Sequence, residues 1–536
     1  MLRTNLTQGT ASLLVAVSAV SCGTTKEKDE RPNIIYIMSD DHTSQAIGVY
    51  GSRLASLNPT PTIDRIGKEG IVMNNAFCTN AISTPSRGCI VSGQYSQTSG
   101  VLDLGTELPL AKQHLPIEMK KLGYETAVIG KWHLHQLPDM FDYYNVFYGQ
   151  GEYFDPVLVE KGSDQIVTYK DQMVPGKQYK GHSSDIVADI TLDWLKNKRD
   201  KSKPFFLKFH FKAPHDMFEF NPKYKDYLED TFIPEPESMW DNKNNGSIAT
   251  RGVNDSLTDT IGSSVGKRNS VRNMGMHMKI DPTLPDDEYK RAAYQEYLKR
   301  YLRCVKGVDD NVKRLFDYLE AENMMDNTII IYTGDQGFYL GEHDYIDKRW
   351  MYEESMRMPF MVRYPKKIKA GTKSDAIVNN VDYAATIIEL AGGKEPEYMQ
   401  GKSFKEILYN GKEPEGWKQA TYYRYWMHMG HNHNNPGHLG IRTKDYKLIL
   451  FYAEDFRPDR QRAKWNSCVG TKTPVAWELY DLKRDPNEMQ NVYGRPEYAE
   501  ITKDLKAQLK QMRIDLKDTD EQYPKIKAVI EEHWND

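Results

Sequence analysis

The chain has 536 residues, with 71 Lys and Arg against 75 Asp and Glu and a formal net charge of −4. Hydrophobic residues make up 39% and aromatic residues 11%, which is enough apolar material for large packed cores and excludes a disordered chain. The balanced charge argues against a dedicated nucleic-acid-binding protein, so we expect no nucleic acid partner. No apolar run reaches the roughly 20 residues that a membrane-spanning helix needs.

Residues 1–22 have the pattern of a bacterial lipoprotein signal peptide. Arg3 precedes the apolar stretch 11–20, and the residues that end at Cys22 resemble a lipobox. We expect Cys22 to be lipidated and to become the mature N-terminus, followed by a polar tether over 23–31. The chain would then be exported and held by a lipid anchor in the periplasm or at the outer-membrane surface. The alternative is an ordinary signal peptide with an incidental cysteine.

Apolar runs that alternate with helical patterns predict a doubly wound α/β domain with a mainly parallel sheet over residues 32–415. Continuous apolar character is typical of strands covered on both faces. The predicted strands are Asn33–Met38, Glu125–Ile129, Phe205–His210, Thr328–Thr333 and Phe360–Arg363. Ligands of such sheets bind beyond the carboxyl ends of the strands.

Two further segments complete the predicted organisation. A helix is expected from Asp286 to about Glu320, and the polar segment 221–279 before it resembles a long surface insertion. Residues 416–536 are expected to form a smaller α+β subdomain with an antiparallel sheet. Its predicted strands are Thr421–Trp426, Leu439–Thr443, Lys447–Phe451 and Trp477–Leu482, with helices from Pro496 and Lys525.

One short motif points to an anion site. In Ser83-Thr84-Pro85-Ser86-Arg87, the proline suits the first position of a helix, which would leave Ser83 just outside the helix N-terminus. Backbone N–H groups and the helix dipole favour an anion there. Arg87 lies one helical turn after Ser83, so its guanidinium can reach the same site.

This motif resembles the first signature of the type I sulfatases, which belong to the alkaline phosphatase superfamily. The stretch from Gly123 to His133 resembles the second signature of that family, and Thr333-Gly334-Asp335-Gln336-Gly337 with the later Lys348 resembles a third family site. The resemblance runs from about Pro32 to Tyr493. It implies an alkaline phosphatase-like fold and a sulfuric ester hydrolase.

The resemblance also implies that Ser83 is converted to formylglycine. One hydroxyl of the hydrated aldehyde would attack sulfur, and the other would lose its proton so that sulfate is expelled. Because a serine stands at the modified position, the partner needed would be a serine-type radical sulfatase-maturating enzyme. The alternative is an unmodified Ser83.

The predicted metal is Ca²⁺. Asp40, Asp41, Asp335 and Gln336 offer oxygen ligands only, and the modified Ser83 would offer another. Such a set suits Ca²⁺ and disfavours zinc, which prefers nitrogen and sulfur. Gln336 stands where many relatives have Asn or His, but glutamine keeps the oxygen ligand.

The resemblance assigns the catalytic side chains. Those that would contact sulfate or move protons are Arg87, Lys131, His133, His215 and Lys348. By resemblance, His133 would take the proton that drives sulfate release, and His215 with Lys348 would protonate the leaving alcohol.

The residues that contact the sugar are less directly indicated. Asp347 and Arg349 flank Lys348 and could hold ring hydroxyls. Among the histidines between His428 and His438, we expect His438 to contact the sugar because it abuts a predicted strand. A metal site in this histidine cluster is disfavoured by its irregular spacing.

These observations favour an exo-acting carbohydrate sulfatase that acts on a sulfated glycan. The context of Lys348 resembles bacterial N-acetylglucosamine-6-sulfatases, with a galactose or N-acetylgalactosamine O-sulfatase as the alternative. A phosphatase or phosphodiesterase of the same superfamily is more remote, because the Asp335-Gln336 pair lacks the histidine such enzymes use. A non-catalytic glycan-binding lipoprotein is disfavoured by the complete catalytic set.

Overall fold

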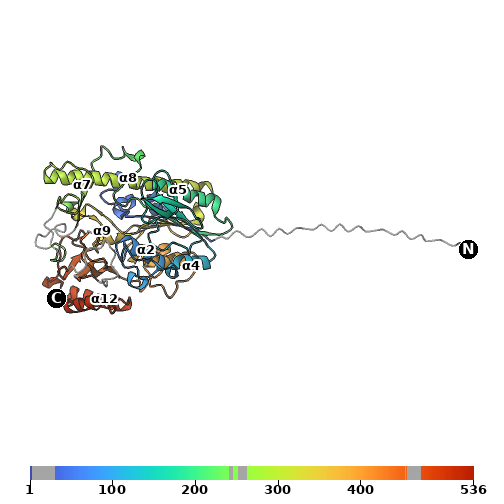
Figure 1. Cartoon of the computed structure of the whole chain (residues 1–536). Coiled ribbons are helices and arrows are strands. Elements are labelled where there is room, and N and C mark those ends of the chain that lie inside the picture. The colour runs from blue at the N-terminus through green and yellow to red at the C-terminus, as the bar shows by residue number, and fades with distance from the viewer. Residues whose placement is uncertain (3–30, 241–245, 252–261, 432, 453, 456–471) are drawn as a thin grey trace.

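A computed structural model describes residues 1–2, 31–240, 246–251, 262–431, 433–452, 454–455 and 472–536 (Figure 1). The predicted signal peptide, the lipidated Cys22 and nearly all of the tether lie outside the described residues. Within the described part of the chain, no helix combines the length and the apolar character needed to cross a membrane.

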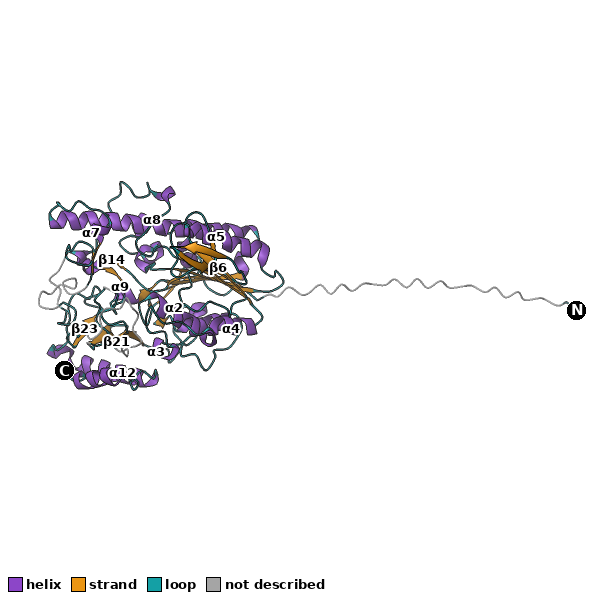
Figure 2. Cartoon of the chain, viewed as in Figure 1, coloured by secondary structure: helices purple, strands orange, loops and turns teal. Residues whose placement is uncertain are grey.

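A ten-stranded mixed sheet forms the centre of the molecule (Figure 2). In spatial order the strands are β18 (Thr372–Ser374), β2 (Ile71–Met73), β17 (Phe360–Arg363), β13 (Thr328–Gly334), β1 (Asn33–Ser39), β10 (Phe205–Phe211), β4 (Glu125–Gly130), β5 (Tyr143–Phe147), β6 (Val157–Glu160) and β9 (Lys177–Gln178). The five central strands from β13 to β5 are mutually parallel, whereas β17 and β6 run antiparallel beside them.

Helices cover both faces of this sheet, which explains why its central strands are apolar throughout. Along β1, Ile34, Tyr36 and Met38 enter one hydrophobic core, and Ile35 and Ile37 enter the other. The first core contains apolar side chains of α2 (Ser83–Ser92), α4 (His114–Lys121) and α10 (Asp382–Leu390). The second contains those of α1 (Ile63–Lys68), α5 (Ser183–Asp193) and α8 (Asp286–Ala321).

The C-terminal region carries a separate antiparallel sheet with its own core. Its four strands are β20 (Ala420–Tyr425), β21 (His438–Thr443), β22 (Tyr446–Phe451) and β23 (Ala476–Asp481). Apolar residues of α12 (Ala499–Asp515) and α13 (Pro524–His533) pack against it. The doubly wound, mainly parallel sheet with a smaller α+β region is therefore confirmed as the fold, and the boundary at residue 415 stays a prediction.

Two local expectations need adjustment. The helix α2 begins at Ser83 rather than at Pro85, so Ser83 occupies its first turn. The segment 221–279 is not a bare loop, because its described residues include β11 (Ser263–Ser264), β12 (Arg272–Asn273) and α7 (Met274–His277). Asn273 caps α7 by accepting a hydrogen bond from the backbone N–H of Met276 at 3.0 Å.

Short elements connect the larger ones. Three strands form a small sheet in the order β16 (Arg357–Met358), β3 (Ala76–Phe77) and β19 (Val378–Asn379). Two further strand pairs are β7 (Ile166–Tyr169) with β8 (Gln172–Pro175), and β14 (Tyr339–Leu340) with β15 (Ile346–Asp347). The remaining described α-helices are α3 (Ser96–Ser99), α9 (Glu353–Met356) and α11 (Lys405–Asn410).

Candidate active site

Three buried carboxylates meet at the carboxyl ends of two neighbouring strands. In the parallel register of β1 and β13, Ser39 pairs with Gly334, so Asp40 and Asp335 follow their strands side by side. Asp40, Asp41 and Asp335 each offer an oxygen, and these oxygens lie within 4.8 Å of one another. All three side chains are fully buried. This arrangement could hold a metal ion.

The electrostatics of this cluster fit a bound cation. Burial and the neighbouring Asp40 raise the pKa of Asp335 to about 7, because a second negative charge in this site is costly. Gln336 lies against Asp41, and its Oε1 is buried without a hydrogen-bond partner among the described residues. An oxygen-only donor set with an unsatisfied amide oxygen is chemistry that suits a hard cation.

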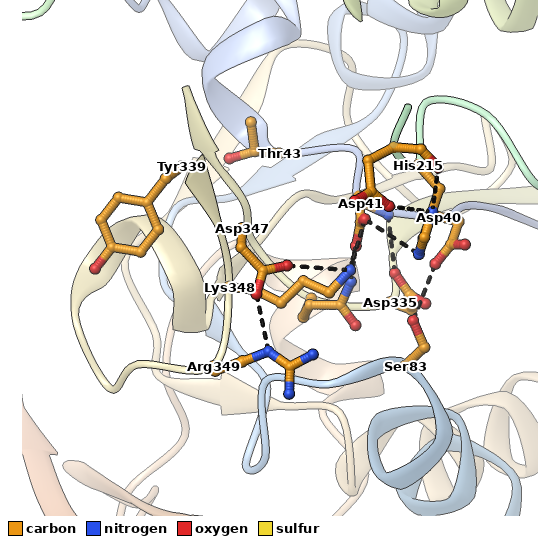
Figure 3. Close-up of polar contacts among 12 residues, drawn as sticks. Asp40, Asp41, Thr43, Ser83, His215, Asp335, Tyr339, Asp347, Lys348 and Arg349 are labelled. Carbon is orange, nitrogen blue, oxygen red and sulfur yellow. Dashed lines mark hydrogen bonds and ion pairs between the residues drawn. The ribbon is translucent and has the colours of Figure 1, made fainter. Parts of the chain in front are cut away.

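Ser83 lies directly beside the carboxylate cluster (Figure 3). It begins α2, and its hydroxyl donates to Asp40 Oδ1 at 3.1 Å. The side chain is almost fully buried but lines a cavity of about 300 Å³, which we call the central cavity. A group bound in this cavity can therefore reach the Ser83 oxygen.

Three cationic side chains surround Ser83 and the carboxylates. Arg87 Nε donates to Asp335 Oδ2 at 3.0 Å, and Lys131 forms an ion pair with Asp40. On the opposite side, Lys348 Nζ lies 2.7 Å from both carboxylate oxygens of Asp41 (Figure 3). Burial would raise the pKa of Asp40, but the charges of Lys131, His215 and Arg87 together outweigh it and hold that pKa well below its usual range.

The two predicted catalytic histidines both line the central cavity. His215 Nε2 lies 3.8 Å from Asp41 Oδ2, while its Nδ1 lies 2.7 Å from Asp216 Oδ1. His133 is nearly buried, and its Nδ1 has no hydrogen-bond partner in the described part of the chain. Burial and the charge of Lys131 hold the pKa of His133 well below its usual range, so this ring is neutral and can accept a proton.

A second polar group, centred on Asp347, also lines the central cavity. Asp347 Oδ2 accepts a hydrogen bond from Arg349 Nε at 2.8 Å, and His433 Nδ1 lies 2.8 Å from the same oxygen. Arg272 forms an ion pair with Asp216 and places Nη1 3.9 Å from Asp347 Oδ1. The central cavity thus presents fixed donors and acceptors in addition to those around Ser83, as a polar ligand would need.

The expectation for His438 is corrected. His438 is fully buried and its ring stacks with Trp350, Tyr423 and Tyr425 at centroid distances of 5.6 to 5.8 Å. It does not line the central cavity, because β21 directs it into the first hydrophobic core. His431 and His433 of the same cluster line the cavity instead.

The other predicted catalytic, metal and sugar-contacting residues lie together at the central cavity or beside the carboxylate cluster, and the structure adds some that the sequence did not assign to the site. The additions along the central cavity are Gln150, Asp216, Arg272, His431 and His433. Three of these residues were partly indicated by the sequence. Asp216 directly follows a predicted catalytic histidine, and His431 and His433 belong to the histidine cluster between His428 and His438. Arg272 comes from the segment 221–279, whose polar composition gave no indication of a role.

Comparison with known proteins identifies the family. The family model described as Sulfatase matches residues 32–393, and the chain therefore belongs to the sulfatase family of the alkaline phosphatase-like superfamily. A second model, described as the C-terminal part of N-sulphoglucosamine sulphohydrolase, matches 341–458 and 464–515. The protein is thus a sulfuric ester hydrolase.

Individual relatives agree with this family. An N-acetylglucosamine-6-O-sulfatase of Bacteroides thetaiotaomicron is 38% identical over 542 residues, which covers 95% of this chain and 91% of the relative. A solved structure described as a complex with its substrate D-glucosamine-2-N,6-O-disulfate is 36% identical, covers 91% of this chain and 99% of that one, and has a TM-score of 0.76. A phosphonate monoester hydrolase from Silicibacter pomeroyi shares only the fold, with 17% identity, 90% and 96% coverage and a TM-score of 0.66.

Proposed function

We propose that this protein is an exo-acting carbohydrate sulfatase that removes the 6-O-sulfate of a terminal N-acetylglucosamine or related glucosamine. The observation that carries this proposal is the lining of the central cavity, which combines Ser83 and Lys348 with the polar side chains of Asp347, Arg349 and His433. Ser83 and Lys348 suit a sulfate ester, and the other three side chains suit the hydroxyls of a sugar ring. The named activities of the relatives described above support the choice of sugar.

The nucleophile in this proposal is Ser83 after conversion to formylglycine. When hydrated, the aldehyde supplies one hydroxyl that attacks sulfur and a second that allows sulfate to leave. The chain's own contribution is positional: α2 places the residue 3.1 Å from Asp40, and Arg87 and Lys131 supply positive charge beside it. The conversion needs a serine-type radical maturating enzyme, the only protein partner that we propose.

The resident metal in this proposal is Ca²⁺, held by Asp40, Asp41, Asp335, Gln336 and the modified Ser83. It would neutralise negative charge beside the nucleophile. The oxygen-only donor set and the unpartnered Gln336 Oε1 support this assignment. Lys131 and Lys348, which pair with Asp40 and Asp41, would then share these carboxylates with the cation or turn towards the sulfate.

Proton transfers are assigned to the two histidines. His215 would donate a proton from Nε2 to the leaving sugar oxygen, because Nδ1 is held at 2.7 Å by the Asp216 carboxylate, which orients the ring. His133, kept neutral by burial and by Lys131, would accept the proton lost during sulfate release. Acid–base help of this kind contributes roughly a hundredfold to ten-thousandfold in rate.

Export as a lipoprotein anchored through Cys22 completes the proposal and follows from residues 1–22 alone. An enzyme that faces the periplasm or the cell surface would meet glycans from outside the cell.

The test is sulfate release by protein produced together with a serine-type maturating enzyme. We expect release from N-acetylglucosamine-6-sulfate and glucosamine-6-sulfate. If sulfate is released preferentially from galactose-6-sulfate or N-acetylgalactosamine sulfate, the protein is a carbohydrate sulfatase as proposed, but the proposed sugar is wrong. Activity on phosphate esters alone would contradict the proposal.

A further inference from the structure

A second cavity adjoins the central cavity and is not explained by binding of one sulfated sugar. We call it the side cavity; it measures about 600 Å³, against about 300 Å³ for the central cavity. Both are lined by Leu104, His133, Gln150 and His431, so the two cavities adjoin along these four residues. A molecule bound at Ser83 that passes between these side chains would enter the side cavity.

The side cavity has a different chemistry from the central cavity. None of the described residues along it is Lys, Arg, Asp or Glu, whereas Asp216, Arg272 and Asp347 line the central cavity. Its apolar and aromatic lining comprises Leu104, Trp132, Leu137, Val146, Phe147, Tyr148, Val159 and Pro175. Its polar side chains include His133, His135, Gln150 and His431. Because no lysine or arginine is present to pair with a second sulfate or a carboxylate, the lining suits an uncharged group with an apolar face.

Tyr148 is the most accessible aromatic ring of the side cavity, with 39% of its surface exposed. Its backbone N–H donates to Val157 at 2.9 Å, and its ring packs edge-on against Tyr169 at 6.2 Å. Tyr169 is itself held by a 2.6 Å hydrogen bond to Glu152. The ring is therefore supported from behind while one surface stays open to a ligand.

We infer that the side cavity binds the next sugar of the glycan, an uncharged pyranose linked to the sulfated sugar in the central cavity. This inference rests on the proposed function. A pyranose has apolar C–H faces that pack on an aromatic ring such as Tyr148. The cavity of about 600 Å³ is too large to be explained by an acetyl group on the terminal sugar. The preferred substrate is then an oligosaccharide rather than the free sulfated sugar.

The test compares the free sulfated monosaccharide with a disaccharide in which an uncharged sugar follows the same sulfated sugar. Wild-type kcat/KM should be about tenfold higher for the disaccharide, as expected from one additional aromatic contact. Tyr148→Ala should abolish this preference and leave the monosaccharide value unchanged, because Tyr148 lines only the side cavity. Leu137→Trp, which narrows the side cavity, should also abolish the preference without removing the ring.

Tyr398→Ala is a matched control, because Tyr398 is 44% exposed and lines neither cavity; it should keep the preference. Affinities of Ser83→Ala protein for both sugars give a readout without turnover, and the disaccharide should bind about tenfold more tightly. Monosaccharide binding without tighter disaccharide binding, or equal losses on both substrates in Tyr148→Ala, would overturn the inference and leave the proposed function standing. If neither the monosaccharide nor the disaccharide binds, both the inference and the proposed function are contradicted.

Discussion

His215 and Asp216 are consecutive in the chain, yet their side chains form a pair in which His215 Nδ1 lies 2.7 Å from Asp216 Oδ1. Arg272, from the segment 221–279, forms an ion pair with the same carboxylate. Burial would raise the pKa of Asp216, but the charges of His215 and Arg272 outweigh it and hold that pKa well below its usual range. The carboxylate is therefore ionised and orients the imidazole.

This pair predicts the effect of Asp216→Asn. Asparagine cannot form the ion pair that orients the His215 ring, so proton donation from this ring to the leaving sugar oxygen should become less efficient. We expect kcat/KM for a sugar sulfate to fall roughly a hundredfold, and much less for an activated aryl sulfate, whose leaving group needs no proton. Steady-state kinetics on both substrates would measure this difference. Equal slowing of the two substrates would contradict an acid role for His215.

The two histidines should differ in their response to the leaving group. His215→Ala should slow a sugar sulfate much more than an aryl sulfate, because only the sugar oxygen needs protonation. His133→Ala should slow sulfate release, a step that both substrates share. The turnover rates of the two substrates should therefore converge to one slow value. Burst and steady-state kinetics distinguish these outcomes. If His133→Ala discriminated between the substrates and His215→Ala did not, the two assignments would be exchanged.

Conversion of Ser83 is a chemical prediction. The peptide that spans Ser83, from protein made with a serine-type maturating enzyme, should be lighter than encoded by two hydrogen atoms. Mass spectrometry of the intact peptide measures this directly. Protein made without that enzyme serves as the control and should keep the encoded mass and lack activity. Full activity with only serine at position 83 would exclude the aldehyde.

Removal of the metal should abolish activity, and Ca²⁺ should restore it better than Zn²⁺. Stability should respond as well, because Asp335 has its pKa raised from 3.8 to about 7 in the metal-free fold. Ionising it in the fold is therefore unfavourable, and the metal-free protein loses stability as pH rises from about 4 to about 7. A bound cation relieves this penalty. The gap in Tm between Ca²⁺-loaded and chelated protein should widen from about pH 5 to about pH 8, and a constant gap would contradict a role of Asp335 as a ligand.

The sequence predicted the architecture well because its signals are local. The apolar run that became β1, and the helical spacing that became α8, follow from periodicities that a buried strand or an amphipathic helix must have. The meeting of the carboxylates Asp40 and Asp335 could also be predicted from the sequence, because residues that follow parallel strands converge at one sheet edge.

The polar group around Asp347 in the central cavity was only partly predictable. Arg272 and Asp216 meet across 56 positions of sequence, and no local pattern specifies such a contact. His433 and His438 belong to one cluster, yet one pairs with Asp347 and the other enters the core. That distinction depends on how the segment before β21 turns, which the irregular Asn- and Gly-containing sequence does not reveal.

His433 and His438 therefore provide a matched pair of substitutions. His433 Nδ1 lies 2.8 Å from Asp347, and both side chains line the central cavity, where they are assigned to the sugar hydroxyls. His433→Ala should raise KM for a sugar sulfate about tenfold with a smaller change in kcat, because the lost contact is made before and during reaction alike. The Tm should change little in comparison.

His438→Ala should show the opposite behaviour. Its buried ring is stacked among Trp350, Tyr423 and Tyr425, so truncation leaves a cavity in the core. We expect a loss of roughly 2–4 kcal/mol in the free energy of unfolding, with KM for the sugar sulfate unchanged below the Tm. Denaturant unfolding and steady-state kinetics on both variants give the comparison. A raised KM in His438→Ala protein of normal stability would reinstate His438 as a sugar-binding residue and contradict its assignment to the core.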